Sequence, residues 1–338
     1  MRGRIEQLDA LPKVDARDKK ILELLSKDGR MPFSAIAKQV RLARDTVDYR
    51  VKRLQKHNIL NGFIPHVNLH SFGYMTYHVF MIINTLNEER KQALLDALIQ
   101  HPNTRSVMEY HDTWDLEWAV IAKDIREFDI IVSELTKDFS DIVRRKDELT
   151  IIKGYKSVQL PGTPYEHYAR DDQPQVKNPE KTKIDTTDMD LLNILTRNAR
   201  LSTYEIGQEL QVSADKVAYR MKRLKEHGVI YGFTSAVNLS ALGYHWYTFS
   251  INLRTMDTKK ERLFTAFIRD NEHVLRAVKI MGHWDILIYI LADSSGSFHT
   301  TFKQIQEKLS AETNEYHIWM AYKEHIFNPL PPVIAKSV

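Results

Sequence analysis

The sequence predicts an α+β protein made of two copies of one module, each with a helical half followed by a half of mixed strands and helices. One observation is an internal repeat that relates Tyr49–Leu54 to Tyr219–Leu224 and Asp115 to Asp285 at the same spacing. The other is that three helical patterns precede a set of strand patterns in each copy. A register that holds over so long a stretch indicates a duplicated module rather than shared composition.

The composition is that of an ordinary globular protein, with 338 residues, 43% hydrophobic, 27% charged and a formal net charge of +4. The absence of cysteine excludes disulfides, cysteine nucleophiles, iron–sulfur clusters and cysteine-type zinc sites. Met1–Lys13 lacks the apolar stretch of a signal peptide, and Trp284–Ala292 is too short an apolar run to cross a bilayer. We therefore expect a cytoplasmic protein without a membrane segment.

The helical half of each copy is predicted to form three helices. Asp15 or Asp18 precedes the first apolar stripe and can supply its N-cap, as Asp185 or Asp188 does in the second copy. A short helix and a longer one follow, and a turn this short between two helices is typical of a helix-turn-helix. Their predicted ranges are 34–40 and 44–57, then 204–210 and 214–227.

The third helix carries an excess of basic residues in both copies. Arg44–Lys56 holds five Lys or Arg against two Asp, and Ala214–Glu226 holds five against two acidic residues. An exposed helix face is often charged in any protein. Here, however, the excess lies on the second helix of the pair, the one that enters a DNA major groove in such proteins, and it recurs in both copies. We therefore predict contact with double-stranded DNA.

The other half of each copy predicts a β-α-β-β-α-β order, the ferredoxin-like split motif. In the first copy the predicted strands are 74–84, 104–110, 115–122 and 148–155, and the predicted helices are 88–100 and 125–139. Both helices cover one face of such a sheet, and the other copy is the expected cover for the other face. The repeat is expected to slip near its end, where Gly154–Lys156 matches Ala321–Lys323.

A set of spaced residues in the helical half is similar to the DNA-binding domain of the leucine-responsive regulator/AsnC family. It comprises Asp15, Ile21-Leu22, Asp28-Gly29-Arg30, Ile36-Ala37, Val51–Leu54, Ile59 and Gly62. In the mixed half, Gly282-His-Trp-Asp285 resembles the Gly-x-aromatic-Asp signature of the family's sensor domain. The resemblance covers nearly the whole chain, twice, apart from an N-terminal extension and a linker.

The resemblance implies a sequence-specific transcriptional regulator with sensor domains of the RAM type. In the family these domains pair sheet to sheet, dimers often assemble into octamers, and amino acids are common effectors held at the turn between the second and third strands. We therefore expect an intrachain pseudo-dimer, a higher homo-oligomer and an amino-acid effector.

Several residues depart from the family pattern. Arg41 and Gln211 stand in the turn between the second and third helices, where the family usually has a Gly suited to a left-handed conformation. Ser213 keeps the usual cap of the third helix, whereas Ala43 does not. In the first copy's sensor signature, Asp112 replaces the Gly. Asp112 adds bulk and a negative charge that would repel a ligand carboxylate, so the second copy is expected to hold the better effector site.

The predicted contact residues follow from these positions. Basic side chains along the third helices are expected at phosphates, and residues near their N-terminal ends at base edges. The predicted DNA contacts are Arg44, Asp45, Thr46, Asp48, Arg50, Lys52, Arg53, Lys216, Arg220, Lys222 and Arg223. The predicted effector contacts are Met281, Gly282, His283, Trp284 and Asp285. No catalytic residue, metal site or cofactor is predicted.

Two other functions are compatible with the sequence. Some sirohaem decarboxylases resemble this family in fold and in a fused two-copy layout, in which case His101, His111 and His283 could face a tetrapyrrole. Histidine near a turn is ordinary surface chemistry, however, and no His-Glu-x-x-His or similar ligand spacing is present. A decarboxylase would also have no reason to keep a basic excess on both third helices. The third class is an architectural protein that coats DNA without sensing anything, and the retained Gly282 and Asp285 argue against it.

The fold class predicted is thus two winged helix-turn-helix domains and two ferredoxin-like βαββαβ sensor domains. Prolines and charges mark 161–183 as a linker. The expected domains are 14–66 and 184–236 for the helix-turn-helix units, and 67–160 and 237–330 for the sensor units.

Overall fold

The computed structural model describes residues 3–6, 11–84, 86–163 and 183–335. Most of the predicted linker therefore lies outside the described residues. The two copies keep a single spacing from their first helix to their last strand, because β5 spans Val143–Ser157 and β10 spans Thr313–Phe327. The pairing register agrees, since Gly154 pairs with Val278 while Glu324 pairs with Met108. The expected slip is therefore wrong: a three-residue resemblance suggested it, and the strand register overrides it.

The helical half of each copy contains three helices, as predicted. They are α1 Ala16–Lys27, α2 Phe33–Val40 and α3 Arg44–Lys56, then α6 Thr186–Arg197, α7 Thr203–Leu210 and α8 Ala214–Glu226. The first helix begins with a capping box in which Asp15 and Asp18, or Asp185 and Asp188, accept each other's backbone N–H. Apolar residues at helical spacing, such as Val47, Val51 and Leu54, are buried between the three helices.

The mixed half has the predicted β-α-β-β-α-β order. Its elements in the first copy are β2 Met75–Ile83, α4 Glu88–Gln100, β3 Thr104–His111, β4 Leu116–Ala122, α5 Ile125–Lys137 and β5. In the second copy they are β7 His245–Leu253, α9 Thr258–Asp270, β8 Val274–Met281, β9 Ile286–Ala292, α10 Ser295–Leu309 and β10. Short helices η1 Leu69–Phe72 and η4 Ser240–Leu242 enter the first strand of each unit, and α11 Pro332–Ala335 follows β10.

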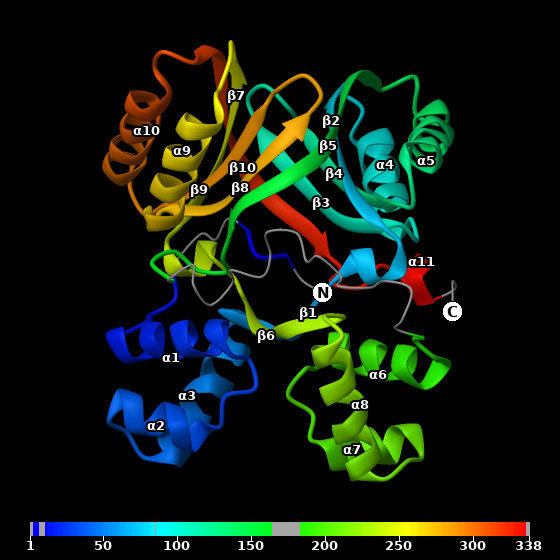
Figure 1. The fold of residues 1–338 in the computed structure, drawn as a ribbon, viewed down its shortest axis with the longest axis vertical. Helices are drawn as coiled ribbons and strands as arrows, with labels where there is room; N and C mark the ends of the chain where they lie inside the picture. The colour runs from blue at the N-terminus through cyan, green and yellow to red at the C-terminus, as the bar shows by residue number, and fades with distance from the viewer. Residues whose placement is uncertain (1–2, 7–10, 85, 164–182, 336–338) are drawn as a thin grey trace.

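The two sensor sheets close into one eight-stranded barrel, in the order β10-β3-β4-β2-β5-β8-β9-β7. The copies therefore pair within the chain, and they do so edge to edge as well as face to face. One seam joins β5 to β8, and the other joins β10 to β3. Figure 1 shows α4 and α5 outside the barrel on one side and α9 and α10 on the other. Closure removes the free strand edges that each sheet would otherwise expose.

A further pair of strands, which the sequence analysis did not predict, joins the two helical halves. Strand β1, Leu60–Val67, runs antiparallel to β6, Ile230–Val237. In Figure 1 this ribbon lies between the barrel and the helix-turn-helix units, and the first copy's α1–α3 lie beneath the second copy's sensor unit. The chain therefore crosses over between its two halves at this ribbon.

The barrel interior is packed with aromatic side chains. Phe80 lies 5.9 Å from Trp114 and 5.5 Å from both Trp284 and Trp319, measured between ring centres. These three tryptophans are almost completely buried. These side chains fill the middle of the barrel, so the two sensor units share one packed aromatic core. Among the described residues, no helix is long and apolar enough to cross a membrane.

Candidate DNA-binding interface and sensor turn

The turn between the second and third helices has the same left-handed corner in both copies. Arg41 has a φ of 53° and Gln211 a φ of 56°. The corner is closed by backbone hydrogen bonds, 3.0 Å from Leu42 N to Ala37 O and 2.9 Å from Val212 N to Gly207 O. A side chain with a Cβ costs roughly 1–2 kcal/mol in this region. The turn keeps the helix-turn-helix geometry despite the missing glycine, at a cost in stability.

The N-termini of the two recognition helices, α3 and α8, are capped differently. Ser213 Oγ accepts a hydrogen bond from Lys216 N at 3.3 Å. Ala43 occupies the same position before α3 and provides no side-chain cap. The difference predicted from the sequence is therefore present, and the first turn of α3 is the less firmly held of the two.

Four of the predicted DNA-contacting arginines are bound to the first helix of their own unit. Arg50 Nη1 lies 2.7 Å from Asp15 Oδ2 and 2.8 Å from Asp18 Oδ1, and Arg53 also donates to Asp18. In the second copy, Arg220 and Arg223 bind Asp185 and Asp188 in the same way. The Asp18 and Asp188 side chains are fully buried. These arginines therefore fix α3 and α8 against α1 and α6.

The side chains exposed on each recognition helix are other than these four arginines. The Lys52 and Lys222 side chains are 72% and 75% exposed, and Arg44 is 69% exposed. Tyr49 and Tyr219, at equivalent positions, are 65% and 63% exposed. The sequence analysis noted this tyrosine only as part of the repeat. An aromatic residue kept in both copies on the helix predicted to meet DNA was the signal that could have singled it out.

The remaining predicted DNA contacts lie in the first turns of these helices. Asp45 and Lys216 are exposed, while Thr46 and Asp48 are half-buried. Asp48 Oδ2 forms an ion pair with Lys52 Nζ at 2.7 Å. The structure thus places Arg44, Asp45, Thr46, Asp48 and Lys52 together on α3, and Lys216 and Lys222 on α8 of the second unit.

The two helix-turn-helix units are held in a fixed mutual orientation. Arg200 of the second unit donates to Gly29 O at 2.8 Å and to Met31 O at 3.1 Å. Its guanidinium also lies 4.3 Å from the ring centre of Phe33. In the opposite direction, Arg30 donates to Ala199 O. With the β1–β6 ribbon, these contacts set the distance between α3 and α8 by the fold itself.

The predicted effector turn, 281–285, contributes mostly to the barrel. Trp284 is 2% exposed, within the aromatic core. The Asp285 carboxylate accepts a hydrogen bond from Leu253 N at 2.7 Å, and Asp115 accepts one from Ile83 N at the same distance. The shared aspartate thus ties the turn to the end of the first strand. Of the five predicted residues, Met281, Gly282 and His283 are exposed.

Gly282 allows another part of the chain to approach closely. Its φ is +155°, and an added Cβ would lie 2.8 Å from Glu148 O and 2.5 Å from a methyl carbon of Leu149. Strand β5 therefore crosses directly over this glycine at the seam with β8. The counterpart Asp112 has a φ of 87° and is exposed. The two turns therefore differ in backbone conformation. That this difference affects effector binding stays a prediction.

Comparison with known proteins reveals the ancestry of both copies. A family model for the AsnC-type helix-turn-helix domain matches residues 14–55 and again 184–225. The transcriptional regulator Ptr1 of Methanocaldococcus jannaschii is 34% identical over 118 residues, which is 34% of this chain and 78% of that protein. The chain belongs to the leucine-responsive regulator/AsnC family. The proline dehydrogenase transcriptional activator of Rhodobacter capsulatus is 30% identical over 130 residues, covering 38% of this chain and 82% of the activator.

These leucine-responsive regulator/AsnC relatives each match less than half of the chain, as a duplicated module requires. A solved structure that covers both copies is the sirohaem decarboxylase NirDL, with a TM-score of 0.61 and 12% identity over 95% of this chain and 98% of the decarboxylase. At that identity the likeness shows a shared fold. A solved protein therefore shares the fold of the whole chain, both copies included.

Proposed function

We propose that this regulator binds double-stranded DNA through α3 and α8 and recognises an operator whose two halves differ. The observation that carries the proposal is the β1–β6 pairing, which holds two helix-turn-helix units of unlike sequence in one chain. A homodimer presents two identical helices and selects a palindrome. Here Arg44, Thr46 and Asp48 correspond to Ala214, Lys216 and Ala218, so the two half-sites are free to differ.

Within this proposal the side chains of the recognition helices have separate tasks. The exposed Lys52 and Lys222 contact phosphates, and the exposed Tyr49 and Tyr219 can donate hydroxyl hydrogen bonds to the same backbone. Residues of the first helical turns reach base edges. The four arginines bound to Asp18 and Asp188 position the helices and contribute to affinity through that positioning.

The direct test measures binding to labelled duplexes selected from a random pool. The double variant K52A/K222A is expected to bind all sequences more weakly and to lower the salt slope of log K by about 0.9 for each lost contact. K303A, a matched change on an exposed lysine of the sensor unit, is expected to leave both quantities unchanged. No duplex binding by the wild type at low salt, or an unchanged slope in the double variant, would reject the proposal.

In this proposal the sensor barrel regulates DNA binding. The protein acts in the cytoplasm, where several pseudo-dimers associate into a larger assembly. An amino-acid effector at 281–285 would contact the exposed Met281 and His283, since Trp284 and Asp285 are engaged in the barrel. Calorimetry with each amino acid on the wild type and on M281A/H283A tests this site. If the heat of binding is unchanged in the variant, or if no amino acid gives a heat of binding, the proposed effector site is wrong.

A second candidate function is decarboxylation of a tetrapyrrole, which one observation favours: the fold of a sirohaem decarboxylase covers both copies. The basic helices α3 and α8 favour the regulator. Adding iron–uroporphyrin to the purified protein separates the two. A saturable shift of the porphyrin absorbance together with a failure to bind any duplex would favour the enzyme.

A further inference from the structure

The N-terminal segment fills a niche between the second copy's sensor unit and the β1–β6 ribbon. Arg4 O accepts a hydrogen bond from Leu239 N at 2.7 Å, and Ile5 O accepts one from Glu324 N at 2.8 Å. The Arg4 side chain binds Glu324, with Nη2 2.7 Å from Oε1. Ile5 is 2% exposed. We call this space, bordered by Leu239, Ser240, Lys323, Glu324 and Asn61, the filled niche.

The first copy has an equivalent space that the N-terminal segment does not fill. Applying the constant spacing to the five bordering residues gives Leu69, His70, Lys153, Gly154 and Tyr231. All five line a cavity of about 1070 Å³, which also reaches Arg4 and Arg105 at the edge of the filled niche. This volume is at the upper end of the range for small-molecule sites. We call it the open niche.

The sequence has diverged between the two niches at several charged positions, including Glu117 in place of Leu287 and Leu275 in place of Arg105. Glu324, which binds Arg4 in the filled niche, corresponds to Gly154 in the open niche. Lys156 replaces Ile326, and Arg276 replaces Ser106. The open niche has therefore lost the carboxylate that receives an N-terminal arginine, and it has gained two cationic side chains. A second strand like residues 3–6 would not suit it, whereas an anion would.

The acidic groups that line the open niche are themselves engaged. Glu117 replaces Leu287 and accepts hydrogen bonds from His78 Nδ1 at 2.6 Å, from Tyr289 at 3.0 Å and from Tyr110. Burial opposes ionisation of Glu117, but these hydrogen bonds outweigh it and lower the pKa of the carboxyl. Asp124 caps α5 through two backbone N–H groups. Both carboxylates are thus satisfied internally.

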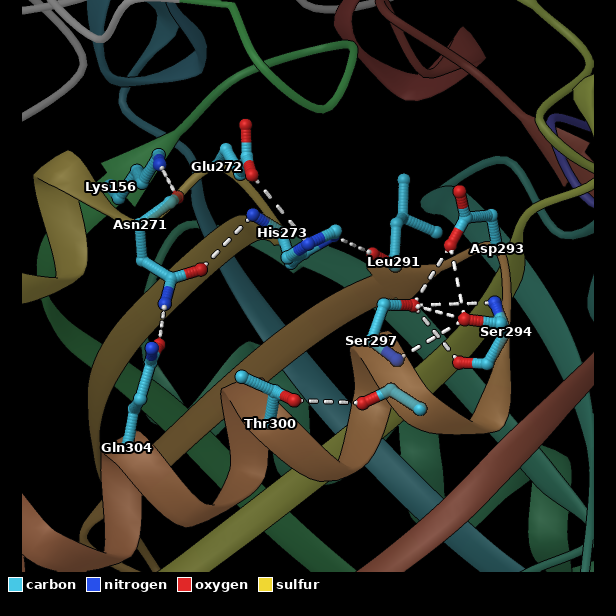
Figure 2. A network of polar contacts seen from close by, with 11 residues as sticks. Lys156, Asn271, Glu272, His273, Leu291, Asp293, Ser294, Ser297, Thr300 and Gln304 are labelled. Carbon is cyan, nitrogen blue, oxygen red and sulfur yellow. Dashed lines mark hydrogen bonds and ion pairs between the residues drawn. The ribbon is translucent and has the colours of Figure 1, made fainter.

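The two added cations are held at the niche by the surrounding fold. Figure 2 shows the Lys156 ammonium donating to Asn271 O, at 2.5 Å, where α9 ends; the Asn271 side chain contacts His273 N and Gln304. Arg276 stacks toward Tyr289, 5.8 Å from the ring centre, and makes no ion pair with any described residue. Arg276 therefore keeps its charge available to a ligand.

The rest of the lining is largely apolar. Leu69, Met75, Val158 and Leu275 contribute aliphatic surface to the same cavity. Such a surface is suited to a ligand with an apolar body, while inorganic phosphate alone would leave it uncovered.

We propose that the open niche binds a small organic anion with an apolar body, with Arg276 and Lys156 as its charge partners. The site lies between the sensor barrel and the ribbon of the helix-turn-helix units, with Met281 of the 281–285 turn among its lining residues, and it needs no DNA to form.

The test uses the full chain and the fluorescent aromatic sulfonate 8-anilinonaphthalene-1-sulfonate as the probe. We expect saturable binding of one probe per chain by the wild type. The double variant K156I/R276S, which restores the residues of the filled niche, is expected to weaken binding at least tenfold. R276K keeps the positive charge and is expected to stay within a few-fold of the wild type, which separates the loss of charge from damage to the fold.

The matched control is K323A, a change beside the filled niche, which is expected to bind the probe as the wild type does. Absence of saturable binding by the wild type, or equal affinity in the wild type and K156I/R276S, would overturn the proposal. Thermal unfolding of each variant is measured in parallel, and the single variant R276S, compared with R276K, replaces the double variant if the latter unfolds early. DNA binding is assayed separately, so a failure to bind the probe and a failure to bind DNA can be told apart.

Discussion

Arg50 and Asp18 join the recognition helix to the first helix of its unit at 2.8 Å, and Arg220 and Asp188 repeat the contact at 2.7 Å. The two carboxylates are fully buried, and each also takes part in the capping box at the start of the first helix. The contact therefore sets where α3 and α8 lie. An arginine on a basic helix of a helix-turn-helix unit can therefore serve to position that helix.

Removing the buried carboxylate should destabilise the first unit strongly. In D18N, Arg50 and Arg53 lose a charged partner, and breaking a buried ion pair in this way costs about 3 kcal/mol or more. Urea unfolding of the full chain gives the measurement, and D188N is expected to have a similar effect on the second unit. A loss below about 0.5 kcal/mol, the level of an ordinary surface change, would contradict the structural role.

The different caps of α3 and α8 give a matched pair of stability predictions. A43S supplies the missing side-chain acceptor and is expected to stabilise the protein by about 0.5–1 kcal/mol. S213A removes the acceptor that binds Lys216 N and should cost a similar amount. Denaturant midpoints of the two variants should move in opposite directions. A shift of both in the same direction would mean that the cap does not limit either helix.

The seam between β3 and β10 should make the protein sensitive to acid. Burial alone would raise the pKa of Glu109, but hydrogen bonds from His325 and Lys91 outweigh it and lower that pKa to about 2. A depressed carboxyl pKa stabilises the fold above the unfolded value near 4.5, and this stabilisation is lost as the pH falls from 4.5 toward 2.

E109Q is therefore expected to lower stability at pH 7 by on the order of 2 kcal/mol. Its difference from the wild type should shrink as the pH falls below 4.5. The control is E315Q, which changes a 56% exposed carboxylate on β10, the strand that pairs with β3 at this seam. Stability curves against pH that remain parallel for E109Q and the wild type would show that Glu109 is not the acid-sensitive group.

The sequence predicted what depends on local pattern and left out what depends on distant partners. Periodicity and caps placed the three helices and the β-α-β-β-α-β order, because both arise within a few residues. Strand β1 was missed, since Gly62 and Pro65 interrupt its alternation and its partner β6 lies in the other copy. The role of Arg50 was missed for a similar reason: a charge on a helix gives no sign of the buried acid that binds it.

The sensor turn illustrates the same limit. Gly282 was interpreted as room for a ligand, because a missing Cβ permits any close approach. In the structure Glu148 and Leu149 of β5 approach this glycine closely, and only the closed barrel brings them there. Comparison of the two copies in the structure was needed to find the open niche, because the fold defines which residues are equivalent.

Making the two recognition helices alike should make the operator symmetric. The first turn of α8 becomes that of α3 in the triple variant A214R/K216T/A218D, since Asp215 and Val217 already match Asp45 and Val47. If these residues read base edges, the DNA selected from a random pool by this variant should be a palindrome of the half-site that α3 prefers. Each corrected base contact is expected to be worth about 1–3 kcal/mol at its cognate base pair.

The reciprocal variant R44A/T46K/D48A supplies the control. It should select a palindrome of the other half-site, and both variants should keep the wild-type salt slope because Lys52 and Lys222 are untouched. The β1–β6 ribbon fixes the distance between the helices, so the spacing between half-sites should be the same in all three proteins. An operator that stays asymmetric in both variants would place sequence recognition outside the first turns of α3 and α8.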